Sequence, residues 1–388
     1  MLLNVRSKGS LKIGIVTYFR VPNYGAMLQA YALWQMLRSM GHEVVFISCP
    51  FSIATRIPLW RCFISRSWKC LKKKLEQFVR YPITEFAAVY PQTKVCYTVE
   101  DCRAVVKDCG VLITGSDQMW NPAWNFGENL RFVMLDFAAV DAKRIAYAVS
   151  FGVKEWHPHP TDVLARELLK QFSAISVREE SGVALVRELS GRTDTQCVLD
   201  PTLLFPAAFY RENICTLASG NLAFQTPYIF RYMLKEWADE RADDAALKIA
   251  KEVLGLSEVC SDCVPANGVT ALFYRMLGVS SHCSVPAWVN TIAHADFVFT
   301  NSFHGTVFAV LLHKPFVSLL LTGKMSGMNE RALSLLSALN LENHAVFSED
   351  ISGIRAAAKA KIDWNAVDEK LHLLRTSAIE WLKKELER

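Results

Sequence analysis

The sequence lacks the features that mark membrane-spanning or secreted proteins. No apolar run approaches the roughly 20 residues that a membrane-spanning helix needs. The first residues also lack the basic and apolar regions of a signal peptide. We therefore expect a cytoplasmic protein.

Metal and cofactor motifs are missing as well. The 11 cysteines are scattered without a paired framework, and no histidine cluster accompanies them at metal-ligand spacing. No G-x-G-x-x-G motif follows the first predicted strand, so a dinucleotide is not indicated. We predict reduced cysteines, no bound metal and no cofactor.

The chain is long enough for two domains and ordinary in composition. Its 388 residues exceed what one core usually organises. Hydrophobic residues make up 51% of the chain and charged residues 21%, which is typical of an α/β protein. The net charge of +5 is small but unevenly distributed.

Residues 56–80, within a basic helical insertion that we place at residues 51–92, outweigh the positive surplus of the whole chain. This segment holds eight lysines and arginines against one acid, Glu76, and it also contains Trp60 and Trp68. A basic helix with aromatic anchors can lie on the anionic inner face of the cytoplasmic membrane. The alternative is a solvated helix packed on its own domain. No nucleic-acid-reading motif accompanies the charge, so we expect no nucleic-acid partner.

Strand and helix patterns alternate along both halves of the chain. In the first half, strands are predicted at residues 12–17, 43–47, 109–114, 144–152 and 173–177, with helices at 26–40 and 161–172. In the second half, strands are predicted at 228–233, 297–299 and 316–321, with helices at 245–254, 284–293, 306–312, 331–339 and 364–386. This alternation predicts two Rossmann-like domains, at 1–205 and 206–363, and a C-terminal helix at 364–388 that packs back on the N-terminal domain.

The stretch of residues 296–318 reads as strand, loop, helix, strand. His304 and Gly305 therefore lie just outside the carboxyl end of a strand, at the start of a helix. Ligands bind at this position in open α/β sheets, and the free N–H groups there favour anions. An imidazole at such a place is a candidate general acid or base. The alternative is a buried histidine satisfied by backbone groups.

Other polar side chains also follow predicted strands. Asp117 can orient or deprotonate a hydroxyl, or it can be a turn or cap residue. Arg178 can clamp a carboxylate or phosphate, or it can form a salt bridge to Glu179 or Asp200. Amide and phenol groups in the loop and helix after the first strand suit the hydroxyls of a sugar. They belong to Asn23, Tyr24 and Gln29.

Six motifs in this order resemble those of the polysaccharide pyruvyl transferase family. They are NYGAMLQ at 23–29, GSDQMWN at 115–121, YAVSFG at 147–152, SVRE at 176–179, VLDPT at 198–202 and TNSFHGT at 300–306. The resemblance implies two Rossmann-like domains that face each other across a cleft in a glycosyltransferase-B-like arrangement. It also implies transfer of a pyruvyl group from phosphoenolpyruvate to two hydroxyls of a sugar, as a cyclic ketal, in the synthesis of capsule, exopolysaccharide or cell-wall polymer.

The resemblance also implies residue roles. His304 matches the family's catalytic histidine, and Arg178 matches an arginine tied to phosphoenolpyruvate. We expect His304, Arg178 and Asp117 to be the catalytic residues, with His304 donating a proton and Asp117 aligning or deprotonating the acceptor. The expected donor-binding residues are Arg178, Ser302, His304, Gly305, Thr306, Lys314, Lys324 and Arg331. The expected acceptor is a sugar or lipid-linked oligosaccharide, held by Asn23, Tyr24, Gln29, Ser116, Asp117 and Gln118.

Two other functions fit the same scaffold. A nucleotide-sugar glycosyltransferase predicts binding of a nucleotide diphosphate. A non-catalytic glycan-binding protein of the same pathway predicts glycan binding without phosphate release. Histidine, arginine and carboxylate together at strand ends favour an enzyme, because a plain sugar-binding site rarely needs all three.

Overall fold

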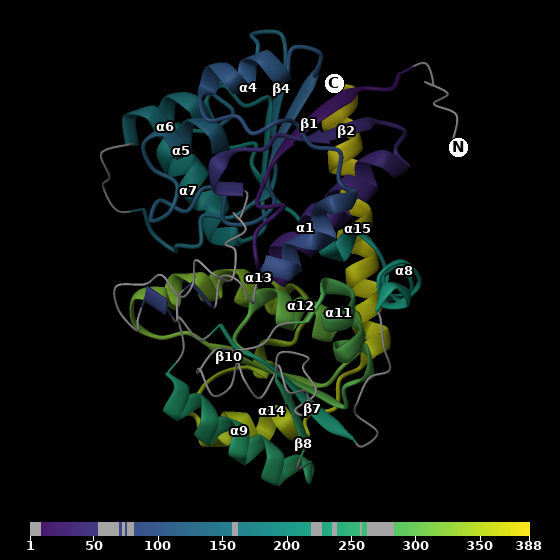
Figure 1. The fold of residues 1–388 in the computed structure, drawn as a ribbon. Helices are drawn as coiled ribbons and strands as arrows, with labels where there is room; N and C mark the ends of the chain where they lie inside the picture. Colours follow the sequence, from purple (N-terminus) through teal and green to yellow (C-terminus); the bar gives the residue numbers. More distant parts are fainter. Residues whose placement is uncertain are drawn as a thin grey trace.

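The computed structural model describes residues 9–52, 70–71, 74–75, 81–156, 162–218, 227–234, 239–256, 258–261 and 283–388. These residues form two α/β domains, one above the other in Figure 1, each built on a parallel sheet. Most of the basic segment of residues 56–80 lies outside the described residues, so its predicted helix and membrane contact stay predictions. Within the described part of the chain, no helix is both long and apolar enough to cross a membrane.

The N-terminal sheet has the described strand order β2-β1-β3-β4-β5-β6. The strands are β1 (Lys12–Val16), β2 (Glu43–Phe46), β3 (Val111–Thr114), β4 (Lys143–Val149), β5 (Ala174–Val177) and β6 (Gln196–Cys197). The helices are α1 (Tyr24–Ser39), α4 (Val99–Val105), α5 (Glu128–Val133), α6 (Asp162–Leu169) and α7 (Glu180–Ser190), with 3-10 turns η1 (Pro50–Ser52) and η2 (Tyr81–Val89). Every residue of β3 and β5 is buried, as expected for strands covered on both faces.

The C-terminal sheet has the described strand order β11-β10-β9-β7-β8, again with parallel pairs. The strands are β7 (Tyr228–Tyr232), β8 (Glu258–Ser261), β9 (Phe297–Thr300), β10 (Phe316–Leu320) and β11 (Ala345–Phe347). The helices and 3-10 turns that accompany it are η3 (Pro201–Leu204), α8 (Ala207–Asn213), η4 (Cys215–Leu217), α9 (Glu240–Leu254), α11 (Val285–His294), α12 (Phe303–Leu311), η6 (Gly323–Asn329), α13 (Glu330–Ala338), η7 (Glu342–His344) and α14 (Ile351–Lys359).

A last helix, α15 (Trp364–Glu387), joins the two domains and appears in yellow along both of them in Figure 1. Near its start, Asp368 contacts the His313 ring of the C-terminal domain at 2.9 Å. Near its end, the backbone oxygen of Leu386 accepts a hydrogen bond from Lys143 of the N-terminal domain at 3.0 Å. The predicted helix that packs back on the N-terminal domain is therefore confirmed.

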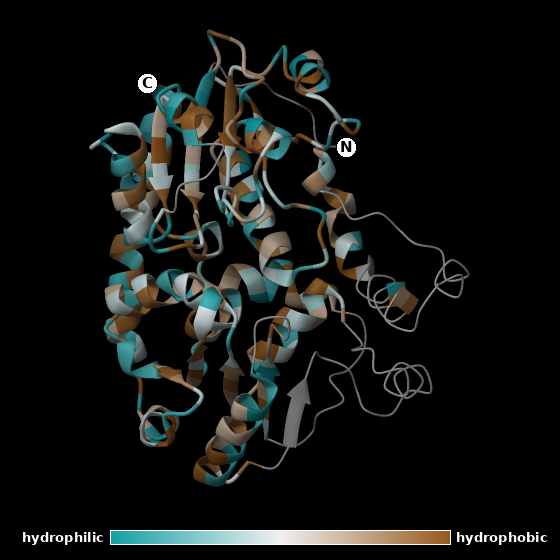
Figure 2. Ribbon diagram, turned by 90° about the vertical axis from the view of Figure 1, so that its left-hand side faces the viewer, coloured by the Kyte–Doolittle hydropathy of each residue, from teal (hydrophilic) through white to brown (hydrophobic). Residues whose placement is uncertain are grey.

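One apolar core runs through both domains on the side of α1, α11, α12 and α15. Tyr24 of α1 stacks on Trp288 of α11 with ring centroids 5.1 Å apart. Figure 2 shows hydrophobic colour on strands inside both domains and a mixture of hydrophobic and hydrophilic colour on the helices around them. The domains are thus held together by burial along one side, which fixes how the strand ends of the two sheets face each other.

The main departures from the predicted elements occur where side chains cap helices. Helix α12 begins at Phe303, three residues before the expected start, because the Ser302 hydroxyl accepts from the N–H of Gly305. Helix α9 begins at Glu240 rather than residue 245, because Asp239 caps it in the same way. The earlier start of α12 places His304 in the first turn of the helix rather than in the preceding loop.

Candidate active site

A cavity of 350 Å³ lies between the two domains, where the carboxyl ends of their strands meet. This volume is in the range of small-molecule sites. Its lining comes from both domains and consists of Tyr18, Val21, Asn23, Ala26, Asp117, Gln118, Trp124, Leu234, Ser302, Phe303, His304 and Arg331. The structure thus brings together six of the predicted site residues, which are Asn23, Asp117, Gln118, Ser302, His304 and Arg331.

His304 reaches this cavity from the first turn of α12. Its side chain is 8% exposed, and its ring meets the edge of Phe303 with centroids 5.0 Å apart. The ring also contacts α1 of the other domain, because a Cβ built on Gly25 would lie 2.0 Å from Nδ1. Its Nε2 atom has no hydrogen-bond partner among the described residues. The alternative was a core histidine whose ring nitrogens are satisfied by backbone groups. No backbone group of the described residues satisfies Nε2.

Asp200 faces His304 across the domain boundary, with Oδ2 at 3.7 Å from Nε2. The same oxygen accepts from Arg178 Nη1 at 2.8 Å and from the Ser116 hydroxyl at 3.2 Å. The other oxygen accepts from the N–H and hydroxyl of Thr202 at 3.0 and 2.7 Å. Burial alone raises the pKa of Asp200, but contact with His304 and then the charge of Arg178 bring the pKa well below its usual range. Asp200 is therefore a fixed anion that faces the imidazole of His304.

Arg178 links Asp200 to the second predicted carboxylate. Its Nη2 atom donates to Asp117 Oδ1 at 3.0 Å, and its side chain is only 1% exposed. Burial lowers the pKa of Arg178, but Asp117 and Asp200 together raise it above its usual value. The predicted salt bridge to Asp200 is thus formed, and Arg178 orients two carboxylates. A direct grip of Arg178 on a donor stays a prediction.

Asp117 stands in the tight turn after β3, which the sequence predicted as a polar loop. Its φ of 78° is in the left-handed region, which aspartate tolerates better than most residues. Its Oδ1 atom accepts from the N–H of Gln118 at 2.9 Å as well as from Arg178. The side chain is 14% exposed and faces the cavity, so its second oxygen can meet a ligand.

Arg331 supplies positive charge to the C-terminal wall of the cavity. It lies in the first turn of α13, and its Nε donates to the backbone oxygen of Met328 at 3.2 Å. Its guanidinium carbon is 5.6 Å from the centroid of the Phe303 ring, and that of Arg178 is 4.8 Å from the same ring. Burial and the neighbouring Arg178 lower the pKa of Arg331 to about 10, so it remains a cation at neutral pH.

Glu179 is a second buried carboxyl beside this cluster. Its Oε1 atom accepts from the N–H of Phe151 at 2.8 Å, and the residue is fully buried. Burial raises the pKa of Glu179 above its usual value, although the Arg178 cation opposes this shift. Unlike Asp200, Glu179 therefore resists ionisation.

Several predicted site residues serve the structure instead of lining the cavity. The Tyr24 hydroxyl donates to the backbone oxygen of Cys283 at 3.0 Å, and Gln29 donates to Thr17 and to the backbone of Ala26. These two predictions are corrected, because both side chains are buried inside the fold.

Three more predicted residues act behind the cavity wall. The Ser116 hydroxyl donates to Asp200, and that of Thr306 contacts Ser318 of β10 at 2.8 Å. Gly305 packs on Thr300, where a Cβ would lie 2.4 Å from the threonine hydroxyl. Ser116 thus touches the site through Asp200, whereas Thr306 and Gly305 hold α12 against its sheet.

Two predicted lysines do not line the cavity. Lys314 follows α12 and precedes β10, so it lies at the amino end of that strand, opposite to the site. Burial lowers the pKa of Lys314, and its nearby charges are Arg211 and Asp296. Lys324 is exposed in η6, after the carboxyl end of β10. For Lys314, closeness in sequence to His304 therefore does not become closeness in space, whereas Lys324 lies on the site's side of the sheet without lining the cavity.

The sequence reasoning missed two contributors to the site. Asp200 was considered only as a salt-bridge partner, although its Asp-Pro-Thr turn signalled a fixed carboxylate. Phe303 was predicted as a loop residue, yet its ring lies close to two guanidinium groups, those of Arg178 and Arg331. The signal that could have identified both is their place inside two of the motifs, Asp200 in VLDPT and Phe303 next to His304 in TNSFHGT.

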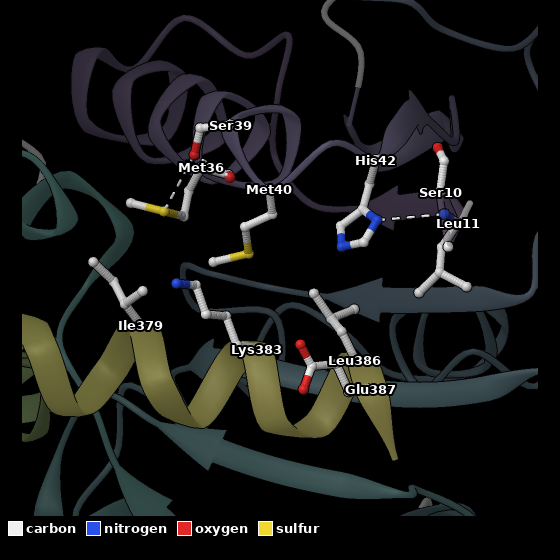
Figure 3. A pocket seen from close by; sticks show the side chains of 11 residues that line it. Ser10, Leu11, Met36, Ser39, Met40, His42, Ile379, Lys383, Leu386 and Glu387 are labelled. Atoms are coloured by element: carbon white, nitrogen blue, oxygen red, sulfur yellow. Dashed lines mark hydrogen bonds between the residues drawn. The ribbon is translucent and has the colours of Figure 1, made fainter. Parts of the chain in front are cut away.

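A larger cavity, of 760 Å³, lies elsewhere, between the end of α1, the start of β1 and α15 (Figure 3). Figure 3 shows Lys383 and Met40 directed into this space, and the N–H of Leu11 donates to His42 Nδ1 at 3.3 Å. It lies at the amino edge of the sheet, opposite to where α/β folds bind their substrates. We therefore assign the active site to the smaller, interdomain cavity.

Comparison with known proteins supports the architecture and places the chain in a family. A family model described as "Polysaccharide pyruvyl transferase" matches residues 23–321. A sequence search of curated proteins gave no significant match.

Solved structures resemble the whole fold at low sequence identity. The UDP-GlcNAc 2-epimerase from Methanocaldococcus jannaschii is 9% identical with a TM-score of 0.52, and the match covers 91% of this chain and 93% of that one. The UDP-GlcNAc 2-epimerase from Neisseria meningitidis, bound to UDP-GlcNAc, is 10% identical with a TM-score of 0.50 and coverage of 94% and 100%. The predicted α/β fold, two Rossmann-like domains facing across a cleft in a glycosyltransferase-B-like arrangement, is confirmed.

Proposed function

The chain belongs to the polysaccharide pyruvyl transferase family, and from this premise we propose that it transfers a pyruvyl group from phosphoenolpyruvate to two hydroxyls of a sugar. The product is a cyclic ketal on a surface polysaccharide or on its lipid-linked precursor, and phosphate is released. One observation carries the proposal: an imidazole that lines the interdomain cavity faces a fixed carboxylate of the other domain, which lies behind the cavity wall.

The two walls of the cavity differ in charge, and this supports a donor side and an acceptor side. The C-terminal wall carries Arg331, His304 and the start of α12, which suit the trianion of phosphoenolpyruvate. The N-terminal wall carries amides, aromatic rings and one carboxylate, Asp117, which suit the hydroxyls of a neutral sugar. Donor and acceptor therefore meet between the domains.

The reaction needs only acid–base chemistry from the protein. A sugar hydroxyl attacks C2 of phosphoenolpyruvate while C3 gains a proton, and the C2–O bond to phosphate then breaks. The second hydroxyl attacks C2 and closes the ketal, and the two hydroxyl protons end on C3 and on the released phosphate. His304, which faces the fixed anion of Asp200, donates a proton to C3 or to the leaving phosphate.

Asp117 prepares the acceptor. Its Oδ1 atom is fixed by Arg178 and by the N–H of Gln118, which directs the remaining oxygen to the cavity. That oxygen aligns the attacking hydroxyl and accepts its proton. Arg178 and Asp200 act through their neighbours, so they are positioning residues.

The test combines donor binding with turnover. We expect phosphoenolpyruvate, and not nucleotide sugars, to raise the melting temperature, and phosphate to appear only when an acceptor glycan is also present. His304→Ala should lower the rate by about 10²–10⁴-fold while the melting temperature stays near that of the wild type. Near-normal transfer by His304→Ala would remove that residue from the mechanism. Stabilisation by nucleotide sugars alone would favour a glycosyltransferase.

Localisation follows from the acceptor and is part of the proposal. We place the protein in the cytoplasm, at the inner face of the membrane if the acceptor is lipid-linked. Binding of the full chain to vesicles with and without anionic lipid tests the peripheral contact that we predict for the basic segment of residues 56–80. Equal binding to both vesicle types would contradict it.

A further inference from the structure

The N-terminal wall of the interdomain cavity carries an exposed aromatic side chain that the mechanism above does not use. Trp124 lines the cavity and is 37% exposed. It belongs to the loop between β3 and α5, on the wall that faces the acceptor, and Phe126, which is 55% exposed, follows two residues later in the same loop. We propose that Trp124 is the platform on which the ring of the acceptor sugar stacks, an inference that rests on the proposed function.

The loop that presents Trp124 is held rigidly by two buried asparagines. Asn121 accepts from the N–H groups of Trp124 and Asn125 at 3.2 and 3.0 Å, and its side chain donates to Gln118 Oε1 at 2.7 Å. Asn125, which stands between Trp124 and Phe126 in the sequence, is buried. It donates to the backbone oxygen of Met119 and to the Tyr18 hydroxyl, both at 2.9 Å.

This anchoring gives Trp124 a fixed position relative to the reacting groups. Asn121 binds Gln118, and Gln118 follows Asp117 directly, so the loop is tied to the residue that prepares the acceptor. Tyr18, bonded to Asn125, lines the cavity beside it. A platform held in this way needs little ordering when a ligand arrives, which lowers the cost of binding.

The chemistry of the wall matches a pyranose ring. A pyranose has an apolar face of C–H groups and an edge of hydroxyls. The face of an indole ring is electronegative and attracts such C–H groups. The hydroxyl edge would then meet Asn23, Gln118 and Asp117, which line the same cavity. With 350 Å³ to hold both substrates, the cavity accepts a single terminal sugar rather than a stretch of polymer.

The test compares Trp124→Ala, Trp124→Phe and Phe347→Ala. Phe347 is 46% exposed at the end of β11 and does not line the cavity, so its variant controls for the loss of an exposed aromatic ring. Binding of a panel of methyl hexopyranosides and methyl N-acetylhexosaminides, without donor, is followed by saturation-transfer NMR and calorimetry. We expect Trp124→Ala to weaken binding of the preferred glycoside about tenfold, Trp124→Phe to retain most of it, and Phe347→Ala to change nothing.

A second readout separates this inference from the proposed function. The melting-temperature shift with phosphoenolpyruvate should be the same in Trp124→Ala as in the wild type, and the acceptor KM should rise while the donor KM stays constant. Glycoside binding that Trp124→Ala leaves unchanged overturns the platform, as does a wild type that binds none of the panel. If glycosides bind through Trp124 but phosphoenolpyruvate neither binds nor reacts, the platform stands and the proposed function falls.

Discussion

The contact between Gly25 and His304 gives a prediction that can be worked out from the structure. Replacing Gly25 by alanine places a Cβ 2.0 Å from His304 Nδ1 and 2.2 Å from the ring carbon Cγ. Ordinary contacts of a Cβ begin at 3.4 Å, so the imidazole or the domain that carries it must retreat by about 1.4 Å, the difference between the two distances. Asp200 and Phe303 border the ring, which limits how it can move.

The expected loss is in catalysis and not in folding. A misplacement of about 1 Å in a catalytic group can cost about 10²-fold in rate. Alanine is a better helix former than glycine by roughly 1 kcal/mol, and Gly25 lies in α1 without a left-handed φ. We therefore expect Gly25→Ala to lower kcat by about 10²-fold while the helix itself gains stability.

The assay measures kcat from phosphate release and stability from thermal unfolding. Gly110→Ala is the matched control, because a Cβ there meets nothing within 4 Å. It should leave kcat unchanged. A Gly25→Ala protein with the kcat of the wild type would refute the reasoning, because it would show that catalysis does not depend on where α1 holds the imidazole.

The other variants separate the roles of the buried charges. Asp200→Asn should lose about 3–5 kcal/mol of unfolding free energy at neutral pH, because it removes the fully buried charge that pairs with Arg178 and leaves Asp117 as its remaining anionic partner. The depressed pKa of Asp200 contributes stability above its unfolded pKa of roughly 3.9. The deficit in urea unfolding should therefore shrink below pH 4, and a deficit independent of pH would contradict this. Glu179 has a raised pKa, so its ionisation costs stability as pH rises above about 4.5. Glu179→Gln should thus gain melting temperature relative to the wild type between pH 4 and pH 7.5, and a constant difference would argue against a strained carboxylate. Arg331→Met should weaken phosphoenolpyruvate binding at least tenfold by calorimetry, roughly the value of one charged hydrogen bond, with the acceptor KM unchanged. Normal donor affinity in this variant would place the anion elsewhere.

The parallel-strand architecture and the location of the site were accessible from the sequence. Short apolar runs followed by polar loops marked the strand ends, and His304, Asp117 and Asn23 all reach the cavity as the strand-end rule predicts. The C-terminal helix was evident from its length and its mixed charge. The motifs at strand ends were therefore the main guide to where the site residues lie.

The parts that the sequence did not predict depend on contacts between distant residues. Tyr24 and Gln29 follow the same strand end as Asn23, but α1 directs their side chains into the core. There Tyr24 stacks on Trp288, and Gln29 donates a hydrogen bond to Thr17. Lys314 is close to His304 in sequence, yet the length of α12 carries it to the other edge of the sheet.

The sequence also does not show which distant residues contact one another. Nothing in the linear order shows that Arg178 would be shared between Asp117 and Asp200, because that depends on the packing of three strands. Nor does it show that Gly25 of one domain would contact His304 of the other.

The most direct test of the account follows the carbon of the donor. Phosphoenolpyruvate labelled with carbon-13 is incubated with the protein and a panel of glycans, and the products are examined by mass spectrometry with phosphate measured in parallel. The account predicts a glycan that carries every labelled carbon of the pyruvyl group, with one phosphate per ketal, and no such product from His304→Ala. Unlabelled glycans throughout, although phosphoenolpyruvate binds the wild type, would contradict it.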